Sequence, residues 1–462
     1  MSIRFVIVGG GPAGNTAATV AARLGAEVTL IERDLVGGAA HLWDCIPSKA
    51  MIATGGFLSE LERARTMGLA AEGALDLPAL RERITSIESR LAHSISDLLE
   101  SQGVRIIRGS GQLKGPHHVI VETAAGVEDV EADAILLATG SRPRVPDWAP
   151  VDGERVLTTR QAYPPPEIPR HLVVIGSGVT GVEFAHMFRS LGSEVSLIVS
   201  RQQVLPGKDP EVAAALEAEF LHRGVALYKG ARAAAIEVDG ADSSGDTPGR
   251  PGLIVRCEDG RSVRGSHAVL AVGSIPNSDM LGLDAAGVVS DRSGYIPVNH
   301  HLQSNVPHIY VAGDLSGKLP LSSVAAMQGR KIAEHVMGLH TRSHRHLDYD
   351  KAASAIFTEP EIADVGLPEA EAFAEGRKLR VTKVPFSSNA KALIEGDPRG
   401  FVKIVSDPAT GVVLGGSIVG RGAAELISVL AVAVTCNLKV TDLVDSLLVH
   451  PALAESLSDA AE

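Results

Sequence analysis

The order of apolar and polar positions predicts two similar units, each built from buried strands separated by a helix. "RFVIVGGGPAG" places a strand over Phe5–Val8, and the apolar run that ends at Glu32 places a second over Val28–Ile31. The same order returns with strands over Leu172–Ile175 and Val195–Val199. Short apolar runs bounded by turn residues are typical of strands buried in a parallel sheet. The pattern therefore predicts an α/β fold with two Rossmann-like units.

The rest of the pattern adds elements around these units. Two segments end in "ATG" and "AVG" and have the character of the last strand of each unit. The C-terminal part alternates short strands with helices, which predicts an α+β domain. The expected elements are helices over 56–68 and 78–104, strands within 133–146 and 266–277, a strand and helix within 308–338, strands over 401–407 and 412–420, and helices over 423–438 and 440–447.

Three stretches interrupt this pattern and divide the chain. "AYPPPEIPRH" (162–171) is too rich in proline for a helix interior. "DGADSSGDTPGRPG" (239–252) predicts an exposed hairpin loop or a disordered insert. A polar linker over 338–351 precedes the last part. We expect four domains, which cover residues 1–150, 151–275, 276–345 and 346–462.

Composition narrows the class of protein. The 462 residues are 45% hydrophobic and 21% charged, with a net charge of −12, which disfavours nucleic acid as a partner. Three cysteines are too few for a disulfide scaffold, so we expect a cytoplasmic protein. No apolar stretch approaches the roughly 20 residues that cross a bilayer, so no integral membrane segment is expected. No metal site is expected either, because His340, His344 and His346 lack typical ligand spacing.

The first strand leads into a dinucleotide-binding motif. Gly9, Gly11 and Gly14 have G-x-G-x-x-G spacing between a strand and a helix, and Glu32 ends the next strand. Gly9 permits the tight turn, Gly11 lets the backbone approach a pyrophosphate, and Gly14 allows close packing of helix on strand. Glu32 can accept hydrogen bonds from a ribose.

The motif recurs with a different ending. Gly176, Gly178 and Gly181 repeat the spacing, but Val199 takes the place of the acid and is followed by Ser200 and Arg201. Without a carboxylate nothing repels a 2′-phosphate, and Arg201 could pair with one, which favours NADPH over NADH. Arg201 as an ordinary solvated residue remains the alternative.

Two dinucleotide sites imply two dinucleotides that meet. The economical pairing is a flavin in one and a nicotinamide in the other, with hydride passing between them. Asp314 follows a strand and is placed to bind a hydroxyl of a ribityl chain or ribose, although a solvated turn residue has the same pattern.

These motifs in order resemble the flavoprotein disulfide reductase family, which includes lipoamide dehydrogenase, glutathione reductase and mercuric reductase. The resemblance rests on both glycine motifs, "CIPSK" (45–49), "ATG" (138–140), "GSIPN" (273–277), "AGD" (312–314), "IFTEPEIADVGL" (356–367), "GFVKIV" (400–405), "IVG" (418–420) and His450-Pro451 with Glu455. It implies an FAD domain, an inserted NAD(P) domain, a return to the FAD side and a C-terminal dimerisation domain. It also implies a homodimer in which each tail completes the partner's active site.

The resemblance implies roles for individual residues. Lys49 would lie near the flavin N5 and pair with Glu183, where a lysine cation stabilises negative charge on a reduced flavin. The alternative is two unrelated residues on separate helices. The residues implied for FAD are Gly9, Gly11, Pro12, Ala13, Gly14, Glu32, Gly38, Ala39, Lys49, Gly111, Thr139, Gly140, Asp314, Leu321 and Ser322; those implied for NAD(P) are Gly176, Gly178, Val179, Gly181, Glu183, Ser200, Arg201 and Gly273.

One departure from the family changes the expected chemistry. Disulfide-reducing members read G-G-T-C-x-x-x-x-C, whereas "GGAAHLWDC" has Ala40 at the first cysteine and Cys45 at the flavin-facing one. Thiol–disulfide exchange needs a second thiol to resolve the mixed disulfide, so disulfide substrates are not expected. Cys257 and Cys436 are expected to be structural thiols. His41 and Trp43 either line an acceptor pocket or only pack.

The family tail is partly retained. It reads H-x-H-P-x-x-x-E in the family, and here Leu448 replaces the first histidine while His450 and Glu455 remain. Glu455 would orient the imidazole, which could protonate an oxygen acceptor. The pair could equally be a remnant that only packs the tail.

The leading hypothesis is an FAD-dependent NAD(P)H oxidoreductase that reduces quinones, and "GGAA…DC" also resembles the start of quinone-reducing actinobacterial family members. A soluble pyridine nucleotide transhydrogenase is the first alternative, because such relatives lack the cysteine pair. A redox enzyme with Cys45 as its single redox centre is the second. A non-catalytic flavoprotein is disfavoured by the two dinucleotide motifs and the Lys49–Glu183 pair.

Overall fold

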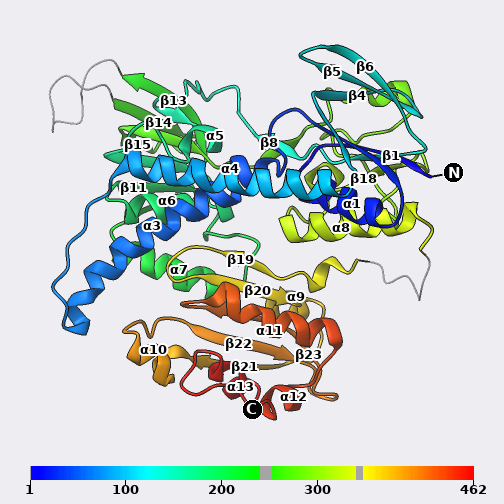
Figure 1. Ribbon diagram of the computed structural model, residues 1–462. Helices are drawn as coiled ribbons and strands as arrows, with labels where there is room; N and C mark the ends of the chain where they lie inside the picture. Colours follow the sequence, from blue (N-terminus) through cyan, green and yellow to red (C-terminus); the bar gives the residue numbers. More distant parts are fainter. Residues whose placement is uncertain (1, 240–251, 340–346) are drawn as a thin grey trace. The chain divides into compact units, whose positions relative to one another are not determined.

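The computed structural model describes residues 2–239, 252–339 and 347–462, which form two compact units (Figure 1). The first unit contains residues up to 48, 78–144 and 273–349; the second contains 49–77, 145–272 and 350–462. Most of the loop expected over 239–252, and the linker histidines 340, 344 and 346, lie outside the described residues. The predicted division into four domains stays a prediction.

The first unit is organised around a parallel sheet of five strands in the order β18-β7-β1-β2-β3. The central strand β1 pairs with β2 on one side and β7 on the other, with Val8 opposite both Ile31 and Leu137. The carboxyl ends of three strands therefore meet at one edge of the sheet. The strands are β1 (Arg4–Val8), β2 (Glu27–Glu32), β3 (Arg105–Arg108), β7 (Ala134–Leu137) and β18 (Ile309–Val311).

The two faces of this sheet are covered differently, and alternate residues of β1 show how. Phe5 and Ile7 pack with α1 (Pro12–Arg23), α8 (Ser322–Val336) and the end of α4 (Leu77–Ser101). Val6 and Val8 pack with a three-stranded antiparallel sheet on the other face. That sheet consists of β4 (Ser110–Gly115), β5 (His118–Thr123) and β6 (Gly126–Glu131).

Helices α1 and α8 lie side by side against the sheet (Figure 1). Their close approach depends on Gly329, where a Cβ would lie 2.1 Å from the carbonyl oxygen of Ala13. The packing holds the first turn of α1 beside the strand ends. Shorter elements of the unit are α2 (Ala39–Leu42), β8 (Ser141–Pro143) paired with β17 (Ser274–Pro276), and 3-10 helices Leu283–Ala286 and Gly313–Ser316.

The second unit also has a parallel sheet of five strands covered on one face by a three-stranded antiparallel sheet. The parallel sheet, in the order β12-β11-β10-β16-β9, carries α6 (Val179–Ser190) after its central strand. The parallel strands are β9 (Val156–Leu157), β10 (His171–Ile175), β11 (Glu194–Val199), β12 (Ala226–Lys229) and β16 (His267–Leu270); the antiparallel ones are β13 (Ala233–Asp239), β14 (Gly252–Cys257) and β15 (Ser262–Gly265). Asp239 pairs with Gly252, so antiparallel strands flank residues 240–251, which lie outside the described residues.

The C-terminal part forms an antiparallel sheet in the order β19-β20-β23-β22-β21, on which α11 packs. Its strands are β19 (Ser354–Ile356), β20 (Ile362–Gly366), β21 (Arg380–Pro385), β22 (Phe401–Ser406) and β23 (Val413–Val419); its helices are α9 (Glu369–Ala374), α10 (Ala390–Ile394), α11 (Ala423–Cys436), α12 (Val440–Val444) and α13 (Glu455–Asp459). The expected α/β class with an α+β C-terminal part is confirmed. Helices α5 (Thr159–Ala162) and α7 (Pro210–His222) complete the unit.

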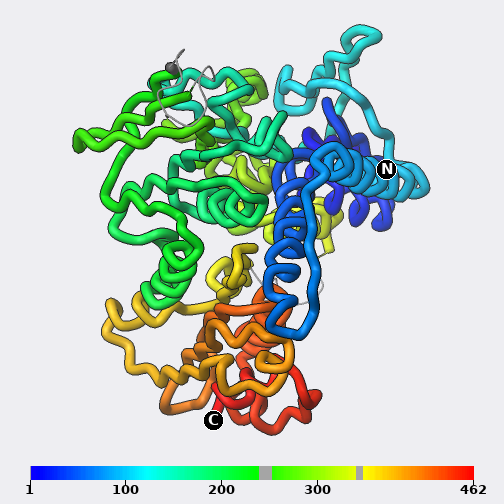
Figure 2. The backbone as a smooth tube through the Cα atoms, turned by 90° about the vertical axis from the view of Figure 1, so that its left-hand side faces the viewer, coloured from blue at the N-terminus to red at the C-terminus, as the bar shows by residue number. Residues whose placement is uncertain are grey.

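The prediction for the helix over 56–68 was wrong at its start. Helix α3 covers Cys45–Arg63 and is followed by a 3-10 helix at Ala64–Met67. Pro47 argues against a helix in the sequence. It is tolerated because it is the third residue of α3, in the first turn, where a backbone N–H has no acceptor within the helix. Gly55 interrupts the apolar pattern because α3 passes Ser190 there, and a Cβ would lie 2.9 Å from the Cβ of Ser190. Figure 2 shows α3 in blue, with the following segment returning beside it. A Cβ on Gly73, in that segment, would lie 2.5 Å from a side-chain carbon of Leu61.

None of the helices in the described part of the chain is long and apolar enough to cross a membrane.

Candidate functional site

The first glycine loop has the geometry of a dinucleotide cradle. Gly9 has a φ of +107°, and a Cβ there would lie 2.3 Å from the carbonyl oxygen of Ala138. A Cβ on Gly14 would lie 1.9 Å from the carbonyl oxygen of Gly9, whereas Gly11 faces open space. Gly11 begins α1 without a side-chain cap, and Pro12 and Ala13 form its first turn. The uncapped helix N-terminus and the open space above Gly11 suit a pyrophosphate.

The second loop repeats these contacts almost atom for atom. Gly176 has a φ of +109° with a virtual Cβ 2.3 Å from the carbonyl oxygen of Ala271, and a Cβ on Gly181 would lie 1.8 Å from the carbonyl oxygen of Gly176. Gly178 faces open space and begins α6, again without a side-chain cap, and Val179 is the first residue of the helix. The same backbone solution therefore occurs in both units.

The strands that follow the two loops end differently. Glu32 is buried at the end of β2; its Oε2 accepts from the N–H of Gly10 at 2.7 Å and its Oε1 from the N–H of Asp34 at 2.8 Å. The carboxylate therefore anchors the glycine loop and keeps further lone pairs for a ribose. Strand β11 ends at Val199, and Ser200 and Arg201 are exposed beyond it.

A second wall of the first unit is tied together by hydrogen bonds. Thr139 donates to the carbonyl oxygen of Asn277 at 2.9 Å, and Asn277 returns a bond to the carbonyl oxygen of Thr139 at 2.9 Å. Gly140 accepts from the N–H of Asn277 at 3.0 Å. Asp314 accepts from Ser141 at 2.6 Å. Ser141 and Asn277 are not among the residues predicted from the sequence; Ser141 directly follows the "ATG" motif, and Asn277 is the last residue of "GSIPN".

The turn after Val36 crosses the first glycine loop. Gly37 donates to the carbonyl oxygen of Gly10 at 2.8 Å, and a Cβ on Gly38 would lie 2.9 Å from the Cα of Gly11. Ala39 starts α2, which also carries Ala40 and His41. Gly111 packs on the end of β1, and Gly273, expected on the NAD(P) side, is grouped with the first unit.

His41 is an unusual member of this turn. Its Nδ1 is buried without a hydrogen-bond partner, and burial lowers the pKa of its ring. The ring is therefore neutral near pH 7.

Cys45 begins α3 and lies 3.8 Å from the hydroxyl of Ser322, the first residue of α8 after Leu321. All three cysteines are free. Cys257 is buried in β14, where burial raises the pKa of its thiol, and Cys436 is exposed at the end of α11. Cys45 therefore has no thiol partner.

Lys49 and Glu183 are brought together in the second unit. The Lys49 Nζ lies 2.9 Å from Glu183 Oε2, and the other oxygen, Oε1, accepts from the N–H of Phe357 at 3.0 Å. The side chain of Glu183 is 6% exposed and that of Lys49 is 32% exposed. The lysine ammonium also lies 4.8 Å from the centre of the Phe357 ring. Both oxygens of the carboxylate are thus fixed by different partners.

His450 and Glu455 also pair, within the C-terminal tail. His450 Nδ1 lies 2.7 Å from Glu455 Oε1, and Glu455 Oε2 accepts from the N–H of Ala452 at 2.9 Å. These two bonds lower the pKa of Glu455. The imidazole is 74% exposed, so its Nε2 is accessible to a reactant.

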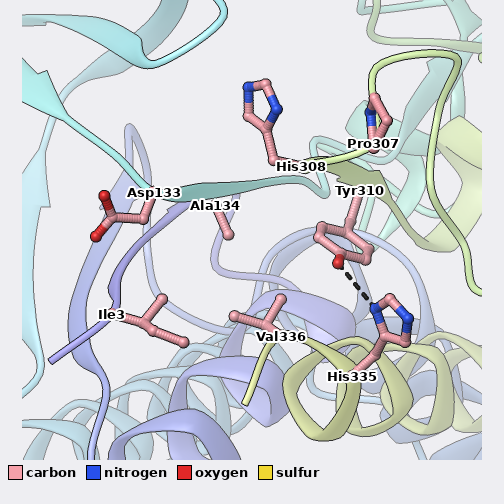
Figure 3. A pocket seen from close by; sticks show the side chains of 8 residues that line it. All are labelled: Ile3, Asp133, Ala134, Pro307, His308, Tyr310, His335 and Val336. Atoms are coloured by element: carbon pink, nitrogen blue, oxygen red, sulfur yellow. Dashed lines mark hydrogen bonds between the residues drawn. The ribbon is translucent and has the colours of Figure 1, made fainter. Parts of the chain in front are cut away.

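A hollow of about 330 Å³ lies at the opposite edge of the first unit's sheet, where the strands begin (Figure 3). Its polar side chains already have partners: Tyr310 bonds His335 at 2.9 Å, Asp133 bonds Arg4, and His308 bonds the carbonyl oxygen of Pro116 at 2.6 Å. Because these residues lie where the strands begin and the glycine loop follows the carboxyl end of β1, the hollow is separate from the dinucleotide cradle. Among the described residues, no group of three or more His, Cys, Asp or Glu side chains could hold a metal ion.

Two uncapped glycine loops on parallel sheets, with an ion pair in the second unit, define a two-dinucleotide oxidoreductase. A model of the pyridine nucleotide-disulphide oxidoreductase family matches residues 3–329, and the model of its dimerisation domain matches 352–461. The chain belongs to this family. It is therefore an FAD-dependent oxidoreductase that uses NAD(P)H.

Individual relatives cover the whole chain. An NAD(P)H dehydrogenase (quinone) from Mycobacterium tuberculosis is 41% identical and aligns with 100% of this chain and 94% of its own length. A dihydrolipoyl dehydrogenase from Zymomonas mobilis is 33% identical and aligns with 99% of this chain and 96% of its own length. The crystal structure of LpdA from M. tuberculosis is 40% identical, covers 99% of both chains and has a TM-score of 0.92.

Proposed function

We propose that this protein transfers hydride from NAD(P)H through FAD to a quinone, and does not reduce disulfides. The observation that carries the proposal is the solitary Cys45: Ala40 stands in the other thiol position, and the hydroxyl of Ser322 lies 3.8 Å from the Cys45 sulfur. A single thiol cannot resolve a mixed disulfide. The higher identity to the quinone dehydrogenase than to the dihydrolipoyl dehydrogenase supports the same conclusion.

The residues of the first unit fit FAD. The cradle over Gly11 and the uncapped start of α1 would hold the pyrophosphate, Glu32 a ribose, and Asp314 a hydroxyl of the ribityl chain. When bound, FAD supplies a ring that accepts hydride from NAD(P)H and releases electrons to an acceptor. The remaining assigned residues of the first unit, Gly38, Ala39, Gly111, Thr139, Gly140, Leu321 and Ser322, would shape the pocket around it.

The chain's own groups would handle charge and protons. Lys49 would place its ammonium beside negative charge that develops during the reaction, and Glu183 orients it through a contact of 2.9 Å. His450, oriented by Glu455, can donate a proton from Nε2 to a reduced acceptor oxygen. The neutral ring of His41 can form a hydrogen bond with an acceptor without adding charge.

We propose NADPH as the preferred donor. The pyrophosphate would rest on the loop at Gly178, and Arg201 would pair with the 2′-phosphate, because no carboxylate ends β11.

We propose that the functional form is a homodimer. The dimerisation-domain model matches residues 352–461, and this part exposes large apolar side chains: Val432 is 58%, Leu447 101% and Val449 75% exposed. Burial of such exposed apolar side chains in a subunit interface would stabilise a dimer. Sedimentation equilibrium should give twice the chain mass; a monomer at micromolar concentration would contradict this.

The three free cysteines fit a reducing compartment, and we propose the cytoplasm. Fractionation of cells that express a tagged chain should recover it with the cytoplasmic proteins. Recovery with secreted proteins would contradict the proposal.

Steady-state turnover with NADPH tests the function. The panel is a benzoquinone, a naphthoquinone, lipoamide, glutathione disulfide and thio-NAD⁺. We expect fast reduction of at least one quinone and no reduction of either disulfide. Lipoamide reduction faster than any quinone would overturn the proposal, and faster reduction of thio-NAD⁺ would show a transhydrogenase instead.

A further inference from the structure

The loop Phe357–Glu361, between β19 and β20, contacts helix α3 at two separated points. Near the start of the helix, the Phe357 ring lies 4.8 Å from the Lys49 ammonium, and the Phe357 N–H donates to Glu183, the partner of Lys49. At the end of the helix, the Glu359 carboxylate accepts from Arg63. Lys49 and Arg63 are 14 residues apart, close to four turns or about 21 Å of helix, so both lie on the same face.

Glu359 is held as a buried anion. Its side chain is 16% exposed, and besides Arg63 it accepts from Arg399 at 2.8 Å. Burial alone would raise the pKa of Glu359, but the hydrogen bond from Arg399 and the charge of Arg63 outweigh it and lower the pKa to about 2. Removal of this charge would leave two half-buried guanidinium groups without their shared partner.

Arg399 is itself fixed from two other directions. It donates to Asp397 at 2.6 and 2.7 Å and to Glu219 on α7 at 2.7 Å. The guanidinium therefore joins α7, the turn before β22 and Glu359. Through Arg63 the same network reaches α3.

We propose that Glu359 is a positioning residue for the Lys49–Glu183 pair. Clamped by Arg63 and Arg399, it fixes the loop so that the Phe357 N–H holds one oxygen of Glu183 while the other oxygen holds Lys49. Without the Phe357 N–H the carboxylate can rotate, and the ammonium loses its fixed direction. The C-terminal domain thereby controls the electrostatics of the redox site. This inference rests on the proposed role of Lys49 at the flavin.

A double-mutant cycle on the FAD-loaded protein tests the inference. The variants are Glu359→Gln, Lys49→Met and the double variant, with Arg63→Gln as a second way to loosen the clamp. The readouts are the flavin reduction potential, measured by dye equilibration, and the single-turnover rate of flavin reduction by NADPH. Asp364→Asn is the matched control, because it breaks a comparable ion pair with Lys208 in the same unit, 2.6 Å long, that does not touch Glu183.

We expect Glu359→Gln and Lys49→Met to make the potential more negative. Glu359→Gln should slow flavin reduction about tenfold, the effect of a mid-range coupling between contacting groups. In the Lys49→Met background, Glu359→Gln should slow flavin reduction by less than about twofold more. Asp364→Asn should change neither the potential nor the rate.

Two results would overturn the inference while leaving the function intact. One is a potential shifted by Lys49→Met but not by Glu359→Gln or Arg63→Gln. The other is full additivity in the cycle, because Glu359 would then not act through Lys49. An unchanged potential in Lys49→Met would overturn both the inference and the proposed role of Lys49.

Discussion

The N–H of Phe357 donates a 3.0 Å hydrogen bond to the carboxylate of Glu183, a residue 174 positions earlier in the chain. This bond satisfies the oxygen that Lys49 leaves free. It joins the C-terminal domain to the helix that follows the second glycine loop.

Lys49→Met should lower quinone turnover about 100-fold, because a fixed cation near developing negative charge contributes at this scale. It should also lower the free energy of unfolding by about 2 kcal/mol, since Glu183, 6% exposed, then keeps a buried charge without its partner. Adding Glu183→Gln should recover part of the stability but none of the turnover. Steady-state assays measure the turnover, and urea titration measures the free energy of unfolding. Equal turnover in wild type and Lys49→Met would contradict the proposed role of Lys49.

Cys45→Ser should keep more than half of the quinone turnover and change the flavin absorption spectrum. Turnover should persist because Cys45 lacks a thiol partner; the hydroxyl of Ser322 lies 3.8 Å from its sulfur. Cys436→Ser, on the exposed end of α11, should change neither property. Loss of nearly all turnover with FAD still bound would show that Cys45 takes part in the chemistry.

Arg201→Ala should raise the KM for NADPH about tenfold and leave the KM for NADH within twofold, because only NADPH carries the phosphate that a guanidinium can pair with. Arg232→Ala removes another exposed arginine of the same unit, one that lies 3.7 Å from Glu258, and should change neither KM. Equal effects on the two cofactors would show that Arg201 does not distinguish them.

His186 should make the protein sensitive to acid. It is 2% exposed and accepts a 3.0 Å bond from Arg223, and burial, with the Arg223 charge, lowers its pKa from 6.5 to about 3. Below pH 6.5 the unfolded chain binds a proton that the folded chain does not, so stability falls as the pH drops from 6.5 toward 3.

His186→Gln keeps an acceptor for Arg223 but does not titrate. From pH 7 to pH 5 the wild type should therefore lose about 2 kcal/mol more of its free energy of unfolding than the variant does. Urea titrations at pH 7, 6 and 5 measure the difference, with His222→Gln on the exposed face of α7 as the control. Parallel pH dependences of wild type and His186→Gln would refute the assignment.

His450→Ala should slow quinone turnover about fivefold, because water can supply protons in place of a positioned donor at a modest cost in rate. Glu455→Gln should reproduce part of the effect through loss of the 2.7 Å bond that orients the ring. An unchanged rate and pH profile in His450→Ala would show that the pair only packs the tail.

Local patterns in the sequence determined the two glycine loops and the strands around them. A Cβ on Gly14 or Gly181 would meet a carbonyl oxygen five residues earlier, and one on Gly9 or Gly176 would meet the residue after an adjacent strand of the sheet, so each position requires glycine. The start of α3 was not predicted correctly, because Pro47 and Gly55 look like helix breakers until the first-turn position of one and the close approach to Ser190 at the other are known.

The absence of a second thiol was also determined by the sequence alone, because it depends on which residue occupies position 40. Only the tertiary structure showed that Glu183 is held by Phe357, that Glu359 is clamped by Arg63 and Arg399, and that His186 is buried against Arg223. These contacts join residues 37 to 296 positions apart, and nothing in a local pattern specifies which distant groups meet. Local sequence fixes the backbone of a turn, whereas the charge environment of a side chain depends on every element that packs around it.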